Sequence, residues 1–432
     1  MKNTKLFQYI FIGAFVFFIL VGAILFATYR SSSQDDVQIN ITVWGTLPSS
    51  SFSAFASQYL KDNELKYTVN YEEKDPATFD QQLVEALASG AGPDAIVLPT
   101  DLIVRYSNKI YPIPYAVLPE LTFKQTFIQE GEMYLTPTGI LALPFTIDPL
   151  VMYWNRDTFN NAGITKPPTT WVEISNLVSK MTKKDQAQNI LSSTVALGEF
   201  RNVANAKEIL SALLIQAGGN IVNRDENGQF VSVLGADFGL KESPTSLALN
   251  FYANFSNPGK AQYSWNRSLP NSRDVFTNGD LAMYFGFASE FTNIKEKNPN
   301  LNFDVALLPQ ISGAKTLNTF GNMLGLAILK SSVDPASTYT VLTALTSASA
   351  VPVWSGFFNL PSARRDILGQ PETNAIKTVF NQSAILSKGW FDPNKVETGK
   401  IFQEMVESYT TGREGLSEAV SSASGRLNNL LK

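Results

Sequence analysis

The stretch LPFTIDPLVMYWNRDTFNNAGITKPPTTW, residues 143–171, carries the strongest indications of the fold. A strand-like apolar run, Leu141–Phe145, is followed by Asp148 and Pro149, and a second apolar run covers Val151–Trp154. Proline cannot donate to a strand ladder and it restricts the residue before it, so the Asp-Pro pair predicts an interrupted strand. We therefore expect the chain to cross between two lobes at this pair.

The residues after the second run carry turn and helix signals. A short helix is predicted over Asp157–Asn161, with its stop at Gly163, and the stiff pair Pro167-Pro168 follows. Thr170 is expected to cap the next helix, and Glu173 to complete a capping box three residues later. Ordinary turn and cap chemistry explains each of these residues singly.

Their order, however, resembles the family 1 extracellular solute-binding proteins of ABC importers, the group that contains the maltose-binding and multiple-sugar-binding proteins. The family pattern is a Leu-Pro strand, an acidic residue, a "YN-(K/R)-D-x-F" turn, "aGI" or "aGL", and then "P-x-T-W-x-E". The matching positions here are Leu143, Pro144, Asp148, Asn155, Arg156, Asp157, Phe159, Ala162, Gly163, Ile164, Pro168, Thr170, Trp171 and Glu173. Trp154 replaces the usual tyrosine, a departure that is expected to alter the cleft surface.

The N-terminal third alternates strand and helix patterns. Strands are predicted over 37–43, 65–71 and 95–98, and helices over 52–60 and 79–87. Such β-α-β-α-β alternation implies a mostly parallel sheet with right-handed crossovers.

Further motifs extend the resemblance over nearly the whole chain from residue 37. They are SGAGPDAIVL at 89–98, FTNGDLAMYFGFA at 276–288 and NLPSARRD at 359–366. The resemblance implies an α/β, two-lobed periplasmic-binding-protein-like fold of class II type, each lobe a mostly parallel sheet flanked by helices, with an N-terminal transmembrane helix in addition. The expected divisions are an anchor and linker at 1–36, lobe 1 at 37–146 and 306–350, and lobe 2 at 147–305 and 351–432.

Composition excludes several classes of function. The chain has 432 residues, a net charge of -4, no cysteine and no histidine. Disulfides, a cysteine nucleophile, a Ser-His-Asp triad and the usual zinc sites are therefore excluded, and no basic footprint for nucleic acid is present. We expect no cofactor and no metal.

The N-terminus contains an uncharged stretch, Leu6–Ala27, preceded by Lys2 and Lys5. It is longer than the roughly 7 to 15 apolar residues of a signal peptide and close to the ~20 that span a bilayer. We expect a retained single-pass anchor in the cell membrane, with the binding domain on the extracytoplasmic side. The alternative is a signal cleaved after Ala27, although Leu25 stands where a small residue is preferred.

Candidate ligand-binding residues follow from the rule that ligands of open α/β sheets bind beyond the carboxyl ends of strands. Aromatic plates beside carboxylate, amide or guanidinium groups suit the apolar faces and hydroxyls of a sugar. From this rule and the resemblance, the candidates are Trp44, Asp101, Asp148, Phe287, Asn322, Trp354, Trp390 and Arg364. Trp171 is expected to be structural, and no catalytic residue is expected.

The function that these features favour is capture of a mono- or oligosaccharide by hinge closure and its delivery to ABC permease subunits. Two alternatives stay open. One is a surface glycoside hydrolase with paired carboxylates such as Asp101 and Asp148. The other is an anchored sensing or adhesion module without transport.

The absence of histidine also predicts a pH response. Histidine is the usual group that titrates between about pH 6 and 8. Affinity for an uncharged sugar should therefore be flat in this range, unless the pKa of a cleft carboxylate is strongly raised.

Overall fold

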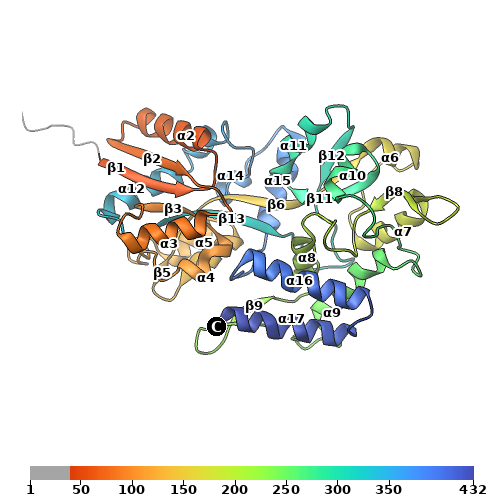
Figure 1. Cartoon of the computed structure of the whole chain (residues 1–432). Helices are drawn as coiled ribbons and strands as arrows, with labels where there is room; N and C mark the ends of the chain where they lie inside the picture. Colours follow the sequence, from red (N-terminus) through yellow and green to blue (C-terminus); the bar gives the residue numbers. More distant parts are fainter. Residues whose placement is uncertain (1–38) are drawn as a thin grey trace, which may run out of the picture.

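The computed structural model describes residues 39–432 (Figure 1). The predicted anchor, the linker and Val37 lie outside the described residues. Within 39–432, no helix combines the length and the apolar character that a bilayer crossing requires.

One nine-stranded sheet runs through both halves of the molecule, in the order β2-β1-β3-β13-β6-β11-β8-β7, with β12 also paired to β6. The strands are β1 (Ile39–Gly45), β2 (Tyr67–Glu73), β3 (Ala95–Pro99), β6 (Leu143–Asn155), β7 (Lys183–Lys184), β8 (Ile190–Val195), β11 (Leu281–Phe287), β12 (Phe303–Ala306) and β13 (Gly321–Ile328). Strand β1 is parallel to β2 and β3, and β8 is parallel to β11, whereas the pairs made by β6, β7 and β13 are antiparallel. The sheet is therefore mixed, which corrects the expectation of a mostly parallel sheet in each lobe.

Strand β6 joins the two halves without the predicted interruption. Residues 143–149 pair with β13, and residues 150–155 pair with β11 and β12. Pro149 lies where the neighbours change, and its carbonyl still accepts the amide of Ala288 at 3.0 Å. The missing N–H of Pro149 is tolerated at this point because Leu150 resumes the ladder by donating to Phe320.

Two separate hydrophobic cores lie on either side of this point. Ile147 belongs to the first core and Leu150 to the second, so the chain crosses between them at Asp148-Pro149, as the sequence indicated. The chain returns before β13. It crosses for the third time around α15 (Ala375–Leu386), whose Phe380 packs in the second core and whose Ala384 packs in the first.

Helices cover both faces of the sheet in each half (Figure 1). Those around the first core are α2 (Ser49–Asp62), α3 (Phe79–Ser89), α4 (Ile103–Tyr106), α5 (Glu120–Thr126), α12 (Pro335–Leu345), α13 (Val351–Trp354) and α14 (Arg365–Leu368). Those around the second are α6 (Arg156–Asn161), α7 (Trp171–Met181), α8 (Ala206–Gln216), α9 (Pro244–Ala253), α10 (Ser272–Asn278), α11 (Glu290–Lys297), α16 (Lys395–Thr410) and α17 (Leu416–Leu431).

Short elements complete the fold. They are the 3-10 turns η1 (Thr100–Leu102), η2 (Gln129–Tyr134) and η3 (Asn254–Ser256), and the strand pairs β4 (Leu135–Thr136) with β5 (Gly139–Ile140) and β9 (Val222–Arg224) with β10 (Phe230–Ser232).

The segment 351–368 was predicted to belong to lobe 2, but its apolar side chains lie in the first half. Val351, Trp354, Phe358 and Leu368 all pack in the first core. This packing favours a second lobe that resumes after residue 368 rather than at residue 351.

The helix ends predicted around Thr170 are confirmed. Thr170 accepts the amide of Glu173 and Glu173 returns to the backbone of Thr170, which is a complete capping box for α7. Trp171 is buried in the second core, with its ring 5.3 Å from that of Phe285 and its Nε1 donating to Gln216.

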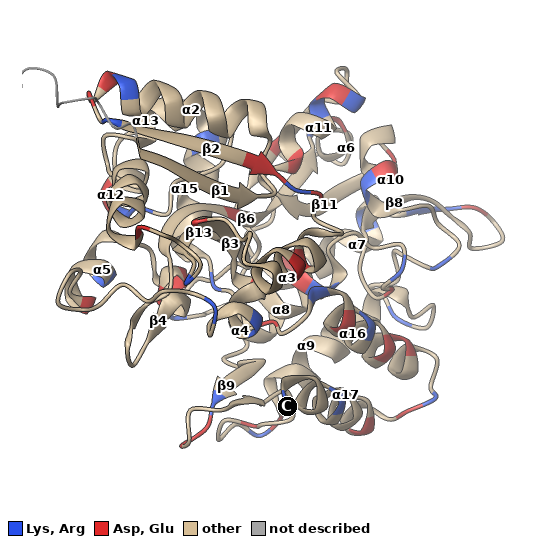
Figure 2. Ribbon diagram, turned by 60° about the vertical axis from the view of Figure 1, so that its left-hand side comes forward, with Lys and Arg blue, Asp and Glu red and all other residues tan. Residues whose placement is uncertain are grey.

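Charged residues are dispersed over the described surface. Figure 2 shows Lys and Arg interspersed with Asp and Glu on many elements rather than gathered on one. This distribution matches the near-balanced composition of 34 basic and 38 acidic residues.

Candidate ligand-binding cleft between the two cores

Among the candidates in the first half, Asp101 gives the clearest indication of a ligand site. It lies in η1, directly after the carboxyl end of β3. Its Oδ1 is buried and has no hydrogen-bond partner. Burial raises the pKa of Asp101, and Lys395, Asp392 and Lys207 of the second half are close enough to act on it. A carboxylate oxygen without a partner has capacity left for a ligand hydroxyl.

The opposite wall is a buried ion pair between Lys207 of α8 and Asp392. Nζ of Lys207 lies 2.7 Å from Oδ2 of Asp392, and the two side chains are only 7% and 9% exposed. The Lys207 ammonium also donates to Oγ1 of Thr398 and to the carbonyl of Lys395. The pair and these hydrogen bonds therefore hold the first turn of α16 and the segment before it against α8.

Trp390 is held by the same pair. The ammonium of Lys207 lies 5.7 Å from the centroid of the Trp390 ring, and the ring stacks on Phe402 at 6.1 Å. Asp392 accepts the amide of Asn394, which in turn caps α16 through the amides of Val396 and Glu397. Trp390 and Lys395 thus belong to one rigid unit, and Lys395 of this unit acts on the pKa of Asp101.

Asp148 lies at the crossing itself, between Ile147 of the first core and Leu150 of the second. Its Oδ1 accepts the amide of Ser289 at 3.0 Å, and its strand partner in β13 is Asn322. The residue is half-buried, but protein atoms enclose its carboxylate, and this burial raises its pKa to about 6. Lys395 acts on the pKa of Asp148 as well as on that of Asp101, which places both acids around one cation.

Phe287 and Trp44 lie at strand ends near this region. Phe287 ends β11 opposite Leu150, and its buried ring is 6.4 Å from that of Phe320. Trp44, near the end of β1, has the Lys74 ammonium 3.6 Å from its ring centroid and a buried Nε1 without a partner. One face of Trp44 is therefore covered, and its indole N–H is the group left to donate.

Arg364 and Trp354 are placed elsewhere. The Arg364 guanidinium is bound by Asp366, at 2.8 Å, and by the carbonyl of Thr346. Trp354 is buried in the first core, 5.5 Å from the ring of Phe145. Neither side chain joins the group formed by Asp101, Asp148 and Trp390.

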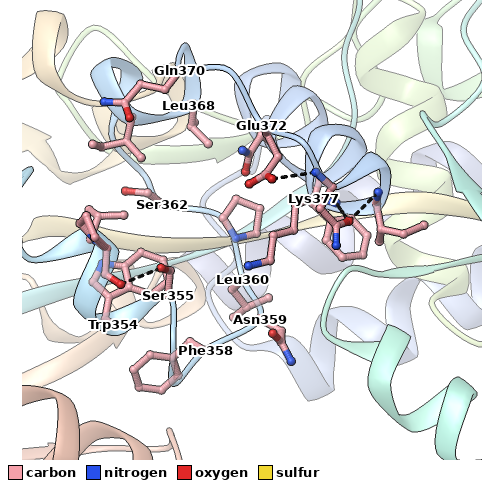
Figure 3. A pocket seen from close by; sticks show the side chains of 18 of the residues that line it. Trp354, Ser355, Phe358, Asn359, Leu360, Ser362, Leu368, Gln370, Glu372 and Lys377 are labelled. Atoms are coloured by element: carbon pink, nitrogen blue, oxygen red, sulfur yellow. Dashed lines mark hydrogen bonds between the residues drawn. The ribbon is translucent and has the colours of Figure 1, made fainter.

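Trp354 instead lines a separate cavity of about 360 Å³ between α11, α13 and α15 (Figure 3). Its walls carry rings from both halves, Phe358 from the first and Phe291 and Phe380 from the second. Glu372 and Lys377 add charges to its lining. Because Trp354 is the only one of the eight candidates in this lining, the cavity is distinct from the predicted site.

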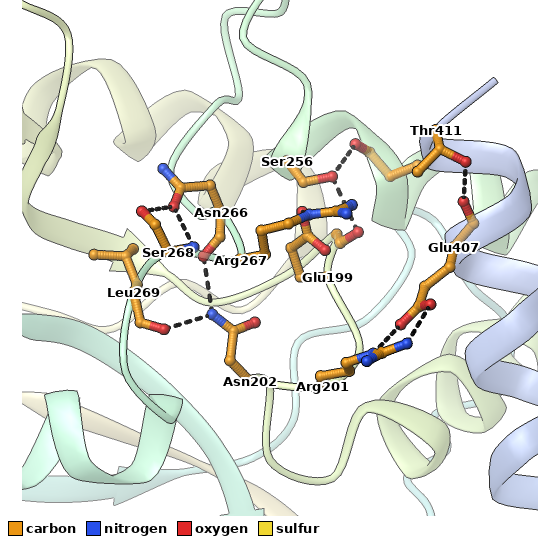
Figure 4. Close-up of polar contacts among 12 residues, drawn as sticks. Glu199, Arg201, Asn202, Ser256, Asn266, Arg267, Ser268, Leu269, Glu407 and Thr411 are labelled. Atoms are coloured by element: carbon orange, nitrogen blue, oxygen red, sulfur yellow. Dashed lines mark hydrogen bonds and ion pairs between the residues drawn. The ribbon is translucent and has the colours of Figure 1, made fainter.

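The loop after β8 is held in place by polar contacts within the second half (Figure 4). Arg201 in this loop makes a two-pronged ion pair with Glu407 of α16, at 2.8 and 3.1 Å. Asn202 donates to the carbonyls of Asn266 and Leu269. These contacts fix the loop against α16 on the second-half side.

The sequence did not reveal Lys207, Asp392 or Lys395 as site residues. Lys207 lies among Ala206, Ile209 and Leu210 on a helix with no unusual pattern, and only the tertiary contact with Asp392 shows its burial. The run Asp392-Pro393-Asn394 was a usable signal, since Asp and Asn before a helix are capping residues. Trp154, the departure from the family pattern, packs on Phe159 in the second core and is buried.

Metal binding has no support among residues 39–432, where no group of three or more Asp or Glu side chains is placed to hold an ion. The arrangement instead offers two carboxylates with raised pKa values, an indole N–H, a tryptophan held on one wall and a lysine ammonium. Such groups bind hydroxyls and apolar ring faces.

Comparison with known proteins identifies relatives of one kind. The family model described as bacterial extracellular solute-binding protein matches residues 54–379. The sn-glycerol-3-phosphate-binding periplasmic protein UgpB of Escherichia coli (strain K12) is 23% identical over 340 residues, covering 72% of this chain and 74% of that protein. A binding protein of Brucella abortus (strain 2308) is 22% identical over 307 residues, covering 67% of each chain.

Solved structures share the fold. A cyclo/maltodextrin-binding protein complexed with maltotetraose superposes with a TM-score of 0.72 at 16% identity, over 92% of this chain and 98% of that one. A solute-binding protein of an ABC transporter from Thermotoga lettingae, bound with alpha-D-tagatose, gives a TM-score of 0.65 at 19% identity, over 91% of this chain and 100% of that one.

Proposed function

Since the chain belongs to the bacterial extracellular solute-binding proteins, we propose that it captures a neutral carbohydrate between its two cores and delivers it to an ABC permease. The observation that carries this proposal is the buried, unpartnered Oδ1 of Asp101, a first-half carboxylate on which Lys395 of the other half acts. A hydroxyl-bearing ligand in this position would satisfy an acceptor that the protein leaves open.

The charges of the cleft favour a neutral ligand over an anionic one. Three carboxylates, those of Asp101, Asp148 and Asp392, surround two ammonium groups, and Lys207 is already committed to Asp392. The guanidinium of Arg364, the arginine predicted for the site, is bound by Asp366. A phosphate would meet two unpaired acids and no free guanidinium fork, whereas sugar hydroxyls can donate to both acids.

The relatives bind ligands of both kinds, so the choice rests on this chain's own residues. UgpB is a glycerol-3-phosphate-binding protein, and the solved structures hold maltotetraose and tagatose. We favour the sugar because the buried carboxylate of Asp101 has an unpartnered oxygen, which can accept a sugar hydroxyl but would repel a phosphate.

Capture proceeds by hinge bending at the three crossings. The ligand contacts Asp101 on one half and Trp390 and Lys395 on the other, and it therefore favours the arrangement in which the halves approach. The closed form is the one that a permease would recognise. The N-terminal anchor remains a prediction, and N-terminal sequencing of the membrane-bound protein distinguishes a chain that begins near Met1 from one cut after Ala27.

A ligand panel tests the proposal. Thermal unfolding of the purified full-length protein should shift upward with at least one neutral mono- or oligosaccharide. At ~100 times its dissociation constant, that sugar should stabilise the folded state by about 2.7 kcal/mol, because it binds no unfolded chain. The control ligand is sn-glycerol-3-phosphate, which should produce no shift.

Stabilisation by the phosphate and by no sugar would overturn the choice of ligand class. The incubated sugar should also show no new reducing ends, since the family consists of binding proteins. Permease genes beside the coding gene would favour the importer over a sensing module.

A further inference from the structure

Glu130 is a buried acid that the ligand site does not use. It lies in η2 of the first half and is 2% exposed. Neither Oε1 nor Oε2 has a hydrogen-bond partner. An ionised carboxylate in this position would be unsatisfied in both oxygens, which is costly in a protein interior.

The carboxylate lies where the chain crossings meet. A Cβ on Gly321 would come within 2.6 Å of Oε2, and a Cβ on Gly389 within 2.8 Å of Oε1. Gly321 opens β13 opposite Pro149 of β6, and Gly389 directly precedes Trp390 of the second core. Glycine at both positions thus permits the close approach of Glu130 to all three crossings.

The second and third crossings are bound to each other beside this carboxylate. The amide of Thr319 donates to Leu386 and the amide of Lys388 donates back to Thr319, each at 2.9 Å. A rotation of the second core that moves Gly389 must therefore also move Thr319 and the neighbouring Gly321, so both glycines that bury Glu130 shift together.

No charge compensates Glu130. Burial raises its pKa well above the usual range, and only the nearby Met323 amide opposes this. The charged residues on the surrounding elements, Lys124, Glu132 and Lys388, do not contribute to the shift. Tyr134 is the other titratable neighbour, and its hydroxyl donates to the carbonyl of Leu98.

We propose that Glu130 is a proton-sensitive hinge residue. It is protonated while Gly321 and Gly389 cover it, and it ionises when the second core swings away and water reaches its carboxylate. This inference concerns the ligand-free hinge and goes beyond sugar capture. Closure then takes up one proton, so low pH favours the closed form and rising pH favours the open one.

The size of the effect follows from linkage. Between the ordinary pKa of a glutamate and the raised pKa of covered Glu130, the ratio of closed to open protein should fall about tenfold for each unit rise in pH. Above the raised pKa the ratio should be constant, because both forms are then ionised.

Energy transfer between two dyes tests the proposal without a ligand. The chain has no cysteine, so Lys61→Cys on α2 and Lys180→Cys on α7 provide two unique and exposed labelling positions, one on each half. In the full-length labelled protein, transfer should change from the closed to the open value as pH rises from about 5 to about 9. Glu130→Gln, a neutral substitute of the same shape, should stay closed across this range.

Matched variants separate Glu130 from other titrating groups. Asp101 and Asp148 also titrate in wild type, so a control for Glu130 is needed. Glu132 lies in the same 3-10 turn as Glu130, but its carboxylate is next to the Lys124 ammonium, and Glu132→Gln is therefore the matched control. Glu132→Gln should keep the wild-type pH response. Gly389→Ala, whose Cβ would strike Oε1, should favour the open form at every pH, and it tests the contact without altering charge.

An unchanged pH response in Glu130→Gln, or no response in wild type, would overturn the proposal. If Glu130→Gln failed to fold, infrared spectroscopy of an Asp101→Asn, Asp148→Asn variant, which keeps the Glu130 carboxyl but lacks the other two buried acids, would decide. A protonated carboxyl band lost on opening supports the proposal, and its absence from the closed form refutes it.

Discussion

Lys207→Met is expected to lower the free energy of unfolding by about 3 to 5 kcal/mol, because it leaves the buried carboxylate of Asp392 without its cation. The loss extends beyond one ion pair, since the Lys207 ammonium also holds Thr398 and the carbonyl of Lys395. Urea denaturation of the purified variant measures the change.

Two matched variants give this prediction its controls. Asp392→Asn added to Lys207→Met removes the uncompensated charge and should recover much of the loss. Arg201→Met breaks the ion pair with Glu407, in which the arginine is 75% exposed, and should cost at most about 1 kcal/mol. Equal effects of Lys207→Met and Arg201→Met would show that the buried pair contributes no more than a surface pair.

Asp148→Asn is expected to stabilise the ligand-free protein while it weakens sugar binding. The folded-state pKa of Asp148 is about 6, above its usual value of 3.8. The folded state therefore binds more protons than the unfolded state between these values, and stability falls as pH rises from about 4 to about 6. At pH 7 the Asp148→Asn variant should therefore have a free energy of unfolding about 2 to 3 kcal/mol higher than that of wild type, since asparagine has no charge to bury.

The binding part of this prediction has the opposite sign. A carboxylate accepts ligand hydroxyls more strongly than an amide, so affinity should fall by about 1 to 3 kcal/mol. Calorimetric titration with the sugar from the panel measures it, and urea unfolding at pH 4 and pH 7 measures the stability. A variant that was stabilised equally at both values of pH, or that bound normally, would contradict the role given to Asp148.

The pKa of Asp148 also qualifies the flat pH response expected from a chain without histidine. With a pKa of about 6, Asp148 changes its ionisation at the lower end of the range from pH 6 to 8. In the Glu130→Gln variant, whose hinge should not titrate, affinity should therefore decrease below about pH 6 and remain nearly constant above pH 7.

Local sequence signals predicted the elements that depend on local chemistry. The capping box of Thr170 and Glu173 and the crossing at Asp148-Pro149 follow from side chains within a few residues of each other, and both are present. The strand through Pro149 does not break, because a change of neighbouring strands at that residue removes the need for its missing N–H.

The direction of strands that return from the other half, and contacts between residues far apart in sequence, could not be predicted from local sequence signals. The β-α alternation near the N-terminus correctly indicates parallel β1, β2 and β3, but the antiparallel pairing of β13 depends on a return of the chain from the other half. Arg364 was a candidate because the resemblance pointed to it as a forked donor, yet Asp366, two residues later, binds its guanidinium. Lys207 and Asp392 are far apart in sequence, and only the folded chain shows that they form a buried pair.

The location of the sugar is the most direct test of an interlobe binding site. A crystal structure of the protein with the best sugar of the panel should show hydroxyls within hydrogen-bond distance of Asp101 and Asp148, and the ring of Trp390 against the sugar. A sugar bound instead in the cavity between α11, α13 and α15, with nothing between Asp101 and Lys395, would contradict the site and the closure mechanism built on it.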